Sequence, residues 1–198
     1  MKIKKLPQPF RKRGFTLIEL LVVIMIIGVL AGLSFGALTA VKKLGEKTKA
    51  KNDVAQIKMA VANYFNDYNK YPIPKAGSDV DLETDRSFMA VLMGEDKELN
   101  PRENNYIQPK PANSAGKGGM VSPGGGIGEY VDPWGQPFQL RIDGDYDERL
   151  KNPNTGSQTK QIFAGVAVWS SGPDQDGKGE MGASGSTDLW KDSITSWE

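Results

Sequence analysis

The chain has 198 residues, which allows one compact domain together with one extended element. It contains no cysteine and no histidine, which excludes disulfides, thiolate nucleophiles, histidine-based triads and the usual zinc and haem ligand sets. The formal net charge of +1 conceals an uneven distribution, because residues 1–14 hold six of the 25 basic side chains and none of the 24 acids. The rest of the chain is therefore acidic, which gives no support to a nucleic-acid partner.

An uncharged apolar run follows the basic N-terminal segment. Residues 20–41 carry no charged side chain, and 22 residues of helix are enough to cross a hydrocarbon core of ~30 Å. The basic block predicts a cytoplasmic N-terminus under the positive-inside rule. An ordinary signal peptide cleaved after Ala31 and a plain signal anchor both fit this pattern. Neither explains Glu19 at the start of the run, where a charge in lipid is costly unless it has a partner.

The boundary segment Gly14-Phe15-Thr16-Leu17-Ile18-Glu19 follows three basic residues and leads directly into the apolar run. This arrangement resembles the class III signal of type IV pilins and of type II secretion pseudopilins. The resemblance implies that residues 1–14 are a leader, that prepilin peptidase cuts between Gly14 and Phe15, and that the new amine of Phe15 is methylated. A residue without a side chain suits the cleavage position, because a protease can approach its backbone closely. In that family the carboxylate at the position of Glu19 pairs with the N-terminal amine of a neighbouring subunit during assembly.

A polar but still helical stretch continues the apolar run. Its apolar side chains step by three or four residues, which is one face of an α-helix, and they are Leu38, Val41, Leu44, Val54, Ile57, Val61, Tyr64 and Tyr68. The pattern predicts one helix from Phe15 to about Tyr68, with Asn69 as its cap and with Pro72 and Pro74 preventing continuation. Residues 15–41 are the predicted transmembrane and assembly half, and residues 42–198 are the predicted periplasmic domain.

Shorter elements follow the second proline. Residues 84–93 predict a short helix capped by Thr84 or Asp85, and the glycine-rich residues 113–128 predict an irregular, mobile surface loop. Strands are predicted from the alternation over residues 138–142 and from one longer buried run, 162–169. The fold class is therefore α+β: a long N-terminal helix packed on a small antiparallel sheet, as in the type IV pilin-like fold.

The C-terminal segment is rich in acids and glycine. Its oxygen ligands suit Ca²⁺, although composition alone favours a solvated acidic loop. Four pieces together resemble the major pseudopilin of type II secretion systems: Tyr71-Pro72, Asp132-Pro133-Trp134-Gly135, the Ser-x-Gly-x-Asp at residues 170–174, and Trp197. The resemblance implies a calcium site made by Asp174, by Asp188 and by the main-chain carbonyl of Ser171. The sequence departs from the family pattern near residues 179–192, so Asp192 is an alternative second ligand and Asp176 is either a ligand or a bystander.

The resemblance implies a structural protein rather than an enzyme: a pseudopilus subunit held as a precursor in the inner membrane, with a cytoplasmic N-terminus. The implied partners are further copies of the chain, other pseudopilins, prepilin peptidase and the inner-membrane assembly platform. A surface type IV pilus or competence pilin is the alternative. A membrane-anchored enzyme would need a carboxylate pair or a serine–lysine dyad, and no sequence motif marks either one.

Overall fold

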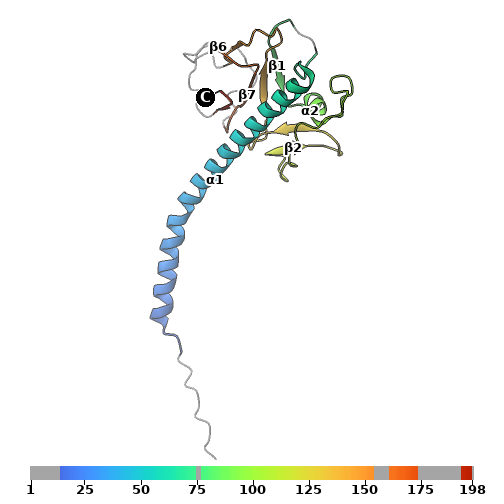
Figure 1. The fold of residues 1–198 in the computed structure, drawn as a ribbon. Helices are drawn as coiled ribbons and strands as arrows, with labels where there is room; N and C mark the ends of the chain where they lie inside the picture. Colours follow the sequence, from blue (N-terminus) through green and yellow to red (C-terminus); the bar gives the residue numbers. More distant parts are fainter. Residues whose placement is uncertain (1–13, 75–76, 154–160, 174–192, 198) are drawn as a thin grey trace, which may run out of the picture. The chain divides into compact units, whose positions relative to one another are not determined.

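The computed structural model describes residues 14–74, 77–153, 161–173 and 193–197, without the side chains of residues 33–37. Residues 1–43 and 44–198 form two separate units. Figure 1 shows the elements, which in chain order are α1 (Leu17–Tyr68), β1 (Val80–Glu83), α2 (Arg86–Met93), β2 (Gly119–Val121), β3 (Glu129–Val131), β4 (Gln139–Ile142), β5 (Leu150–Lys151), β6 (Gln161–Ile162), β7 (Val166–Ser170) and β8 (Ile194–Thr195).

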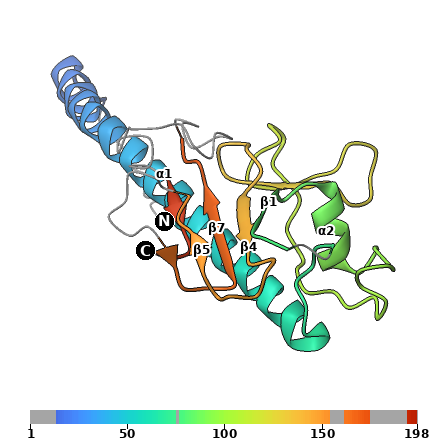
Figure 2. The ribbon, with the colours of Figure 1, turned by 90° about the horizontal axis from the view of Figure 1, so that it is seen from above.

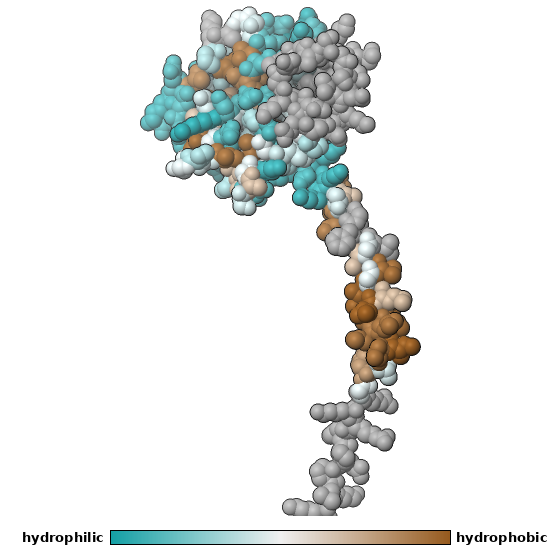
Figure 3. All heavy atoms as spheres, turned by 180° about the vertical axis from the view of Figure 1, so that it is seen from behind, coloured by the Kyte–Doolittle hydropathy of each residue, from teal (hydrophilic) through white to brown (hydrophobic). Residues whose placement is uncertain are grey.

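The predicted long helix is present as α1, which begins two residues later than expected and ends where expected. It ends because Asn69 adopts the left-handed region with φ 53° while its N–H donates to the carbonyl of Phe65 (2.7 Å). In the first unit the large apolar side chains are exposed, as the brown part of α1 in Figure 3 shows. No helix within the described residues is both long enough and apolar enough to cross a membrane.

The second unit contains a four-stranded antiparallel sheet with the strand order β1-β4-β7-β8. The register places Leu82 opposite Leu140 and Leu140 opposite Val168, so apolar side chains line up across the sheet. The second half of α1 crosses one face of this sheet (Figure 2). The main core joins the two elements, and it includes Val54, Ile57, Val61, Tyr64, Phe138, Leu140, Ile142, Val166 and Val168. The predicted α+β fold is confirmed.

The predicted short helix is α2, and Asp85 rather than Thr84 is its N-cap. The Asp85 carboxylate accepts a hydrogen bond from the N–H of Phe88 (2.8 Å), which satisfies one of the free donors at the helix start. Gly94 ends the helix at φ 84°, and a side chain there would collide with the carbonyl of Glu103. Thr84 does not cap the helix. Its hydroxyl instead donates a hydrogen bond to the carbonyl of Tyr130 (2.5 Å).

The prediction of an irregular loop over residues 113–128 was wrong in part. β2 lies inside this range and pairs antiparallel with β3, which follows it. The turn between them contains Gly124, Gly125 and Gly126, all with φ between 80 and 86°, a backbone region that favours glycine. These glycines therefore form the turn of a hairpin. Tyr130 and Val131 in its second strand, β3, are buried.

The predicted continuous strand over residues 162–169 was also wrong. Ile162 belongs to β6, which pairs with β5, whereas Val166–Ser170 form β7 in the main sheet. Phe163, in the break between them, is 77% exposed. The chain turns where Gly165 passes the hydroxyl of Tyr71 so closely that any side chain would overlap it. The apolar pattern of residues 162–169 did not predict this break, because the break involves a contact with Tyr71, which is distant in the sequence.

Candidate functional site

The described chain begins with a capping box at the start of α1. Thr16 precedes the first helical residue, and its N–H and hydroxyl donate to Oε2 of Glu19 at 2.8 and 2.6 Å. The N–H of Glu19 in turn lies 3.3 Å from the Thr16 hydroxyl oxygen. This reciprocal pattern is the one that Thr-x-x-Glu forms at helix starts. This capping box was not predicted from the sequence, although the spacing of Thr16 and Glu19 was the available signal.

The residues directly before this capping box are exposed to solvent. Phe15 is 78% exposed, and a side chain built at Gly14 would meet nothing within 4 Å. Gly14 therefore lies in an accessible, non-helical stretch. Such a stretch suits a protease, which binds its substrate in an extended conformation along the backbone.

A buried carboxylate organises the Asp-Pro-Trp-Gly turn, one of the motifs that resemble the major pseudopilin. Asp132, which is 0% exposed, lies in the Asp-Pro-Trp-Gly turn before β4. Its Oδ1 accepts hydrogen bonds from the N–H groups of Trp134, Gly135 and Gln136 at 2.9, 2.8 and 3.0 Å. Its Oδ2 accepts a hydrogen bond from the Ser170 hydroxyl at 2.6 Å. Asp132 thus connects this turn to the end of β7, where Ser-x-Gly-x-Asp begins.

The serines at the end of β7 are buried. The Ser170 oxygen also accepts from the N–H of Gly172 (3.2 Å), which has φ 83°. Ser171 is 1% exposed, and its hydroxyl has no hydrogen-bond partner within the described part of the chain. Asp174, Asp176, Asp188 and Asp192 lie outside the described residues. Of the predicted calcium ligands, only Ser171 is therefore described.

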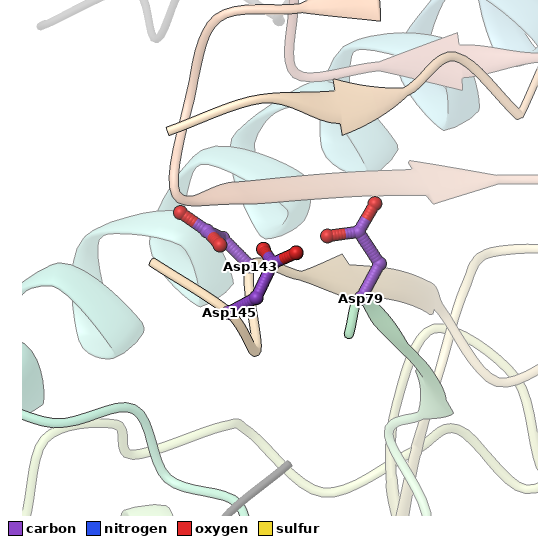
Figure 4. Close-up of side chains that lie close together, drawn as sticks. All are labelled: Asp79, Asp143 and Asp145. Carbon is purple, nitrogen blue, oxygen red and sulfur yellow. The ribbon is translucent and has the colours of Figure 1, made fainter. Parts of the chain in front are cut away.

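The structure brings together three carboxylates that the sequence analysis did not connect (Figure 4). Asp79 lies just before β1, and Asp143 and Asp145 follow β4; their nearest oxygens lie within 4.8 Å of one another. Burial raises the pKa of Asp79. Partial desolvation and a hydrogen bond with Asp143 raise the pKa of Asp145, which is exposed. Asp143 accepts from the N–H groups of Tyr146 and Glu148 at 2.6 and 2.8 Å. These backbone donors already satisfy Asp143, so the cluster does not by itself define a metal site.

Comparison with known proteins identifies the family. The N-terminal region, residues 9–35, matches the family described as "Prokaryotic N-terminal methylation motif". The type II secretion system core protein G of Pectobacterium carotovorum is 30% identical over 142 residues, which are 69% of this chain and 71% of that protein. The chain belongs to the family of type II secretion system core protein G.

Further relatives extend this similarity. The core protein G of Dickeya chrysanthemi is 31% identical over 66% of this chain and 68% of its own length. That of Escherichia coli K12 is 30% identical over 69% of this chain and 76% of its own length. No solved structure matches the chain. The resemblance to the major pseudopilin that the motifs indicated is thus confirmed by similarity over most of the chain.

The buried carboxylate at position 132 has a testable pH dependence. Burial raises the pKa of Asp132, although hydrogen bonds from Ser170 and from the backbone of residues 134–136 act in the opposite direction. Because the folded-state pKa lies above the unfolded value, the folded state binds the proton more readily. We therefore expect the free energy of unfolding of the wild type, relative to Asp132→Asn, to rise as the pH falls through the folded pKa towards 3.8.

Urea denaturation of fragment 44–198 and its Asp132→Asn variant between pH 7 and 4 measures this difference. Asp81→Asn, at a partly exposed carboxylate with its own arginine partner, is the control. A difference that falls with falling pH would show that the hydrogen bonds outweigh the cost of burying the charge.

Proposed function

We propose that this chain is a structural subunit of a type II secretion pseudopilus, which polymerises into a periplasmic filament that supports protein secretion. The observation that carries the proposal is the similarity to core protein G over about two thirds of the chain. The methylation motif over residues 9–35 supports processing by prepilin peptidase, because it contains Gly14, Phe15 and Glu19. The function is thus assembly, and we assign the chain no catalytic residue.

The apolar surface of α1 supports the membrane part of the proposal. The large apolar side chains between Leu17 and Leu30 are 45 to 83% exposed, and they point in all directions around the helix. A contiguous apolar surface of this kind needs a cover. In our proposal the inner membrane covers residues 15–41 in the precursor, and neighbouring subunits cover them in the filament. Residues 1–14 are then cytoplasmic, and residues 42–198 are periplasmic.

Glu19 is the proposed assembly residue. Its Oε2 is held by Thr16 of the same chain, whereas no hydrogen bond to Oε1 occurs in the described part of the structure. In the proposal the carboxylate pairs with the methylated amine of Phe15 of a neighbouring copy. The pairing is favourable because an unpaired carboxylate inside a dry helix bundle is costly. Prepilin peptidase, other pseudopilins and the inner-membrane assembly platform complete the proposed set of partners.

A type IV pilus or competence pilin on the cell surface is the alternative. The same leader and helix serve both kinds of filament, so the N-terminal segment does not discriminate between them. The three relatives compared above each match about two thirds of this chain and are named for type II secretion, which favours the pseudopilus.

Calcium binding is part of the proposal. Within the described residues the buried Ser171 hydroxyl has no hydrogen-bond partner, and this supports an additional ligand at the start of the acid-rich segment. Ca²⁺ accepts backbone carbonyls and carboxylates in flexible coordination, which fits the carbonyl of Ser171 together with Asp174 and either Asp188 or Asp192. A bound ion would gather acids that otherwise repel one another. Asp132 would hold the start of this segment through its bond to Ser170.

Processing is tested at Gly14. Replacing Gly14 by leucine should leave a full-length, unmethylated precursor, because the added side chain blocks the close approach of the protease to the backbone. Mass spectrometry of the wild-type protein should show N-methylated Phe15 as the first residue. Gly45→Leu, a glycine of α1 with free space around it, is the matched control. A mature N-terminus at Gly32 would instead indicate ordinary signal-peptide cleavage.

Assembly is tested at Glu19. Glu19→Ala should be inserted and processed normally, because loss of a charge makes the helix a better membrane segment. Its filament yield should nevertheless fall by about tenfold or more, since the partner of the Phe15 amine is missing. Thr16→Val is the control, because it removes the capping hydroxyl but retains the carboxylate. A normal yield of Glu19→Ala filaments would contradict the pairing.

Calcium is tested by thermal denaturation of fragment 44–198. At a hundredfold excess over Kd, a ligand that binds only the folded state stabilises it by about 2.7 kcal/mol. The fragment should therefore melt at a higher temperature in millimolar Ca²⁺ than in chelator, and Asp174→Ala should abolish this difference. Asp188→Ala and Asp192→Ala should identify the second ligand, with Asp176→Ala as a further comparison. Equal melting temperatures in calcium and in chelator would contradict calcium binding and would favour the alternative, a solvated acidic loop.

A further inference from the structure

A hollow of about 420 Å³ lies at the C-terminal end of α1, next to the three-carboxylate cluster, with which it shares Asp143. Phe65 and Tyr71 form one wall of it, and the loop after β4 contributes Tyr146, Asp147 and Glu148. Phe163, from the break between β6 and β7, lies on the same lining. The hollow is therefore built from three segments that are far apart in the sequence.

The aromatic rings of this hollow are packed together yet partly open to solvent. The rings of Tyr71 and Tyr146 are stacked with centroids 5.4 Å apart, and Phe65 lies 4.7 Å from Tyr71. Tyr146 is 51% exposed and Phe163 is 77% exposed. An exposed phenylalanine beside stacked tyrosines is an apolar surface that a partner would cover.

The lining of the same hollow carries more acids than bases. It includes Asp143, Asp147 and Glu148 together with one arginine, Arg149. Burial raises the pKa of Tyr71 to about 12, and the nearby charges of Asp143 and Glu148 act in the same direction. Aromatic faces next to carboxylates suit a lysine side chain, because its methylene stem packs on the rings while its ammonium group faces the acids.

A basic surface lies where α1 enters the same unit. Residues 47–51 contain Lys47, Lys49 and Lys51 and no acid. Lys49 pairs with Asp53 of its own helix (2.8 Å), whereas Lys51 is exposed. On α1, Lys51 and Phe65 are separated by 14 residues, or about 21 Å of helix. The basic surface and the hollow therefore lie well apart on one compact unit.

We propose that the hollow receives the exposed Lys51 side chain of α1 from a second copy of this chain. The two surfaces are complementary in charge, and every copy carries both of them. A contact between different surfaces of identical copies is heterologous, and it leaves both ends free to bind further copies. The contact therefore generates an open filament rather than a closed dimer. The inference rests on the proposed filament function, for which it names a contact between globular units.

Cysteine cross-linking tests the contact, because the chain has no cysteine of its own. A chain that carries Glu148→Cys and Lys51→Cys should yield a ladder of disulfide-linked multimers when assembled filaments are oxidised. A disulfide within one chain is excluded, because Glu148 lines the hollow together with Phe65, and about 21 Å of helix separates Phe65 from Lys51. The Cα atoms of a disulfide lie within ~7 Å of each other. Glu148→Cys with Lys97→Cys, an exposed lysine near α2, is the matched control and should give no ladder.

Charge reversal tests the chemistry of the contact. Glu148→Lys and Lys51→Glu should each lower the filament yield about tenfold, since like charges then face one another. The chain with both reversals should recover most of the yield, whereas Glu98→Lys, at an exposed acid elsewhere, should not change it. Assembled filaments of the Glu148→Cys, Lys51→Cys chain that give no ladder on oxidation, or an unaltered yield for Glu148→Lys, would overturn this contact. A wild-type chain that never forms filaments would overturn the proposed function itself.

Discussion

The fold depends on the burial of one face of α1 against the sheet. Ala50, Val54, Ile57, Val61 and Tyr64 are at most 2% exposed, and burying each large apolar side chain contributes about 1.5–3 kcal/mol. The hydroxyl of Tyr64 donates to the carbonyl of Leu99, so the same face also fixes a connecting loop. The other elements are short, and the strands have between two and five residues. Such strands are stable because the helix supplies the surface on which they pack.

The sequence predicts those parts of the structure whose causes are local. The period of three to four residues predicts α1, and the two prolines predict where it ends. The hairpin β2–β3 and the break at Phe163 were not predicted, because they depend on buried positions and on Tyr71 in another segment. Among the site residues, Gly14, Phe15 and Glu19 form one contiguous motif. The hydrogen bond of Asp132 joins residues 38 positions apart, and no local pattern reveals it.

Two kinds of surface remain uncovered in a single copy. One is the apolar surface of α1, whose large side chains are exposed to solvent. The other is the pair of oppositely charged surfaces of the globular unit. These surfaces are exposed to water, so salt weakens the attraction between them. In the proposed filament the apolar surface supplies most of the association free energy. The charged contact supplies register, because wrong alignments place like charges together.

The capping box of Thr16 and Glu19 has a consequence for cleavage. The aligned peptide dipoles of α1 place partial positive charge at its N-terminus, which the Glu19 carboxylate offsets. Before cleavage Phe15 itself contributes only a neutral peptide group there, and the neighbouring positive charges belong to residues 11–13, which leave with the leader. Hydrolysis after Gly14 would add a full ammonium charge within one turn of the same helix end, and methylation would retain that charge. Removal of the leader would thus leave the helix end with more positive charge than its own carboxylate balances, so that a carboxylate from another chain becomes electrostatically favourable.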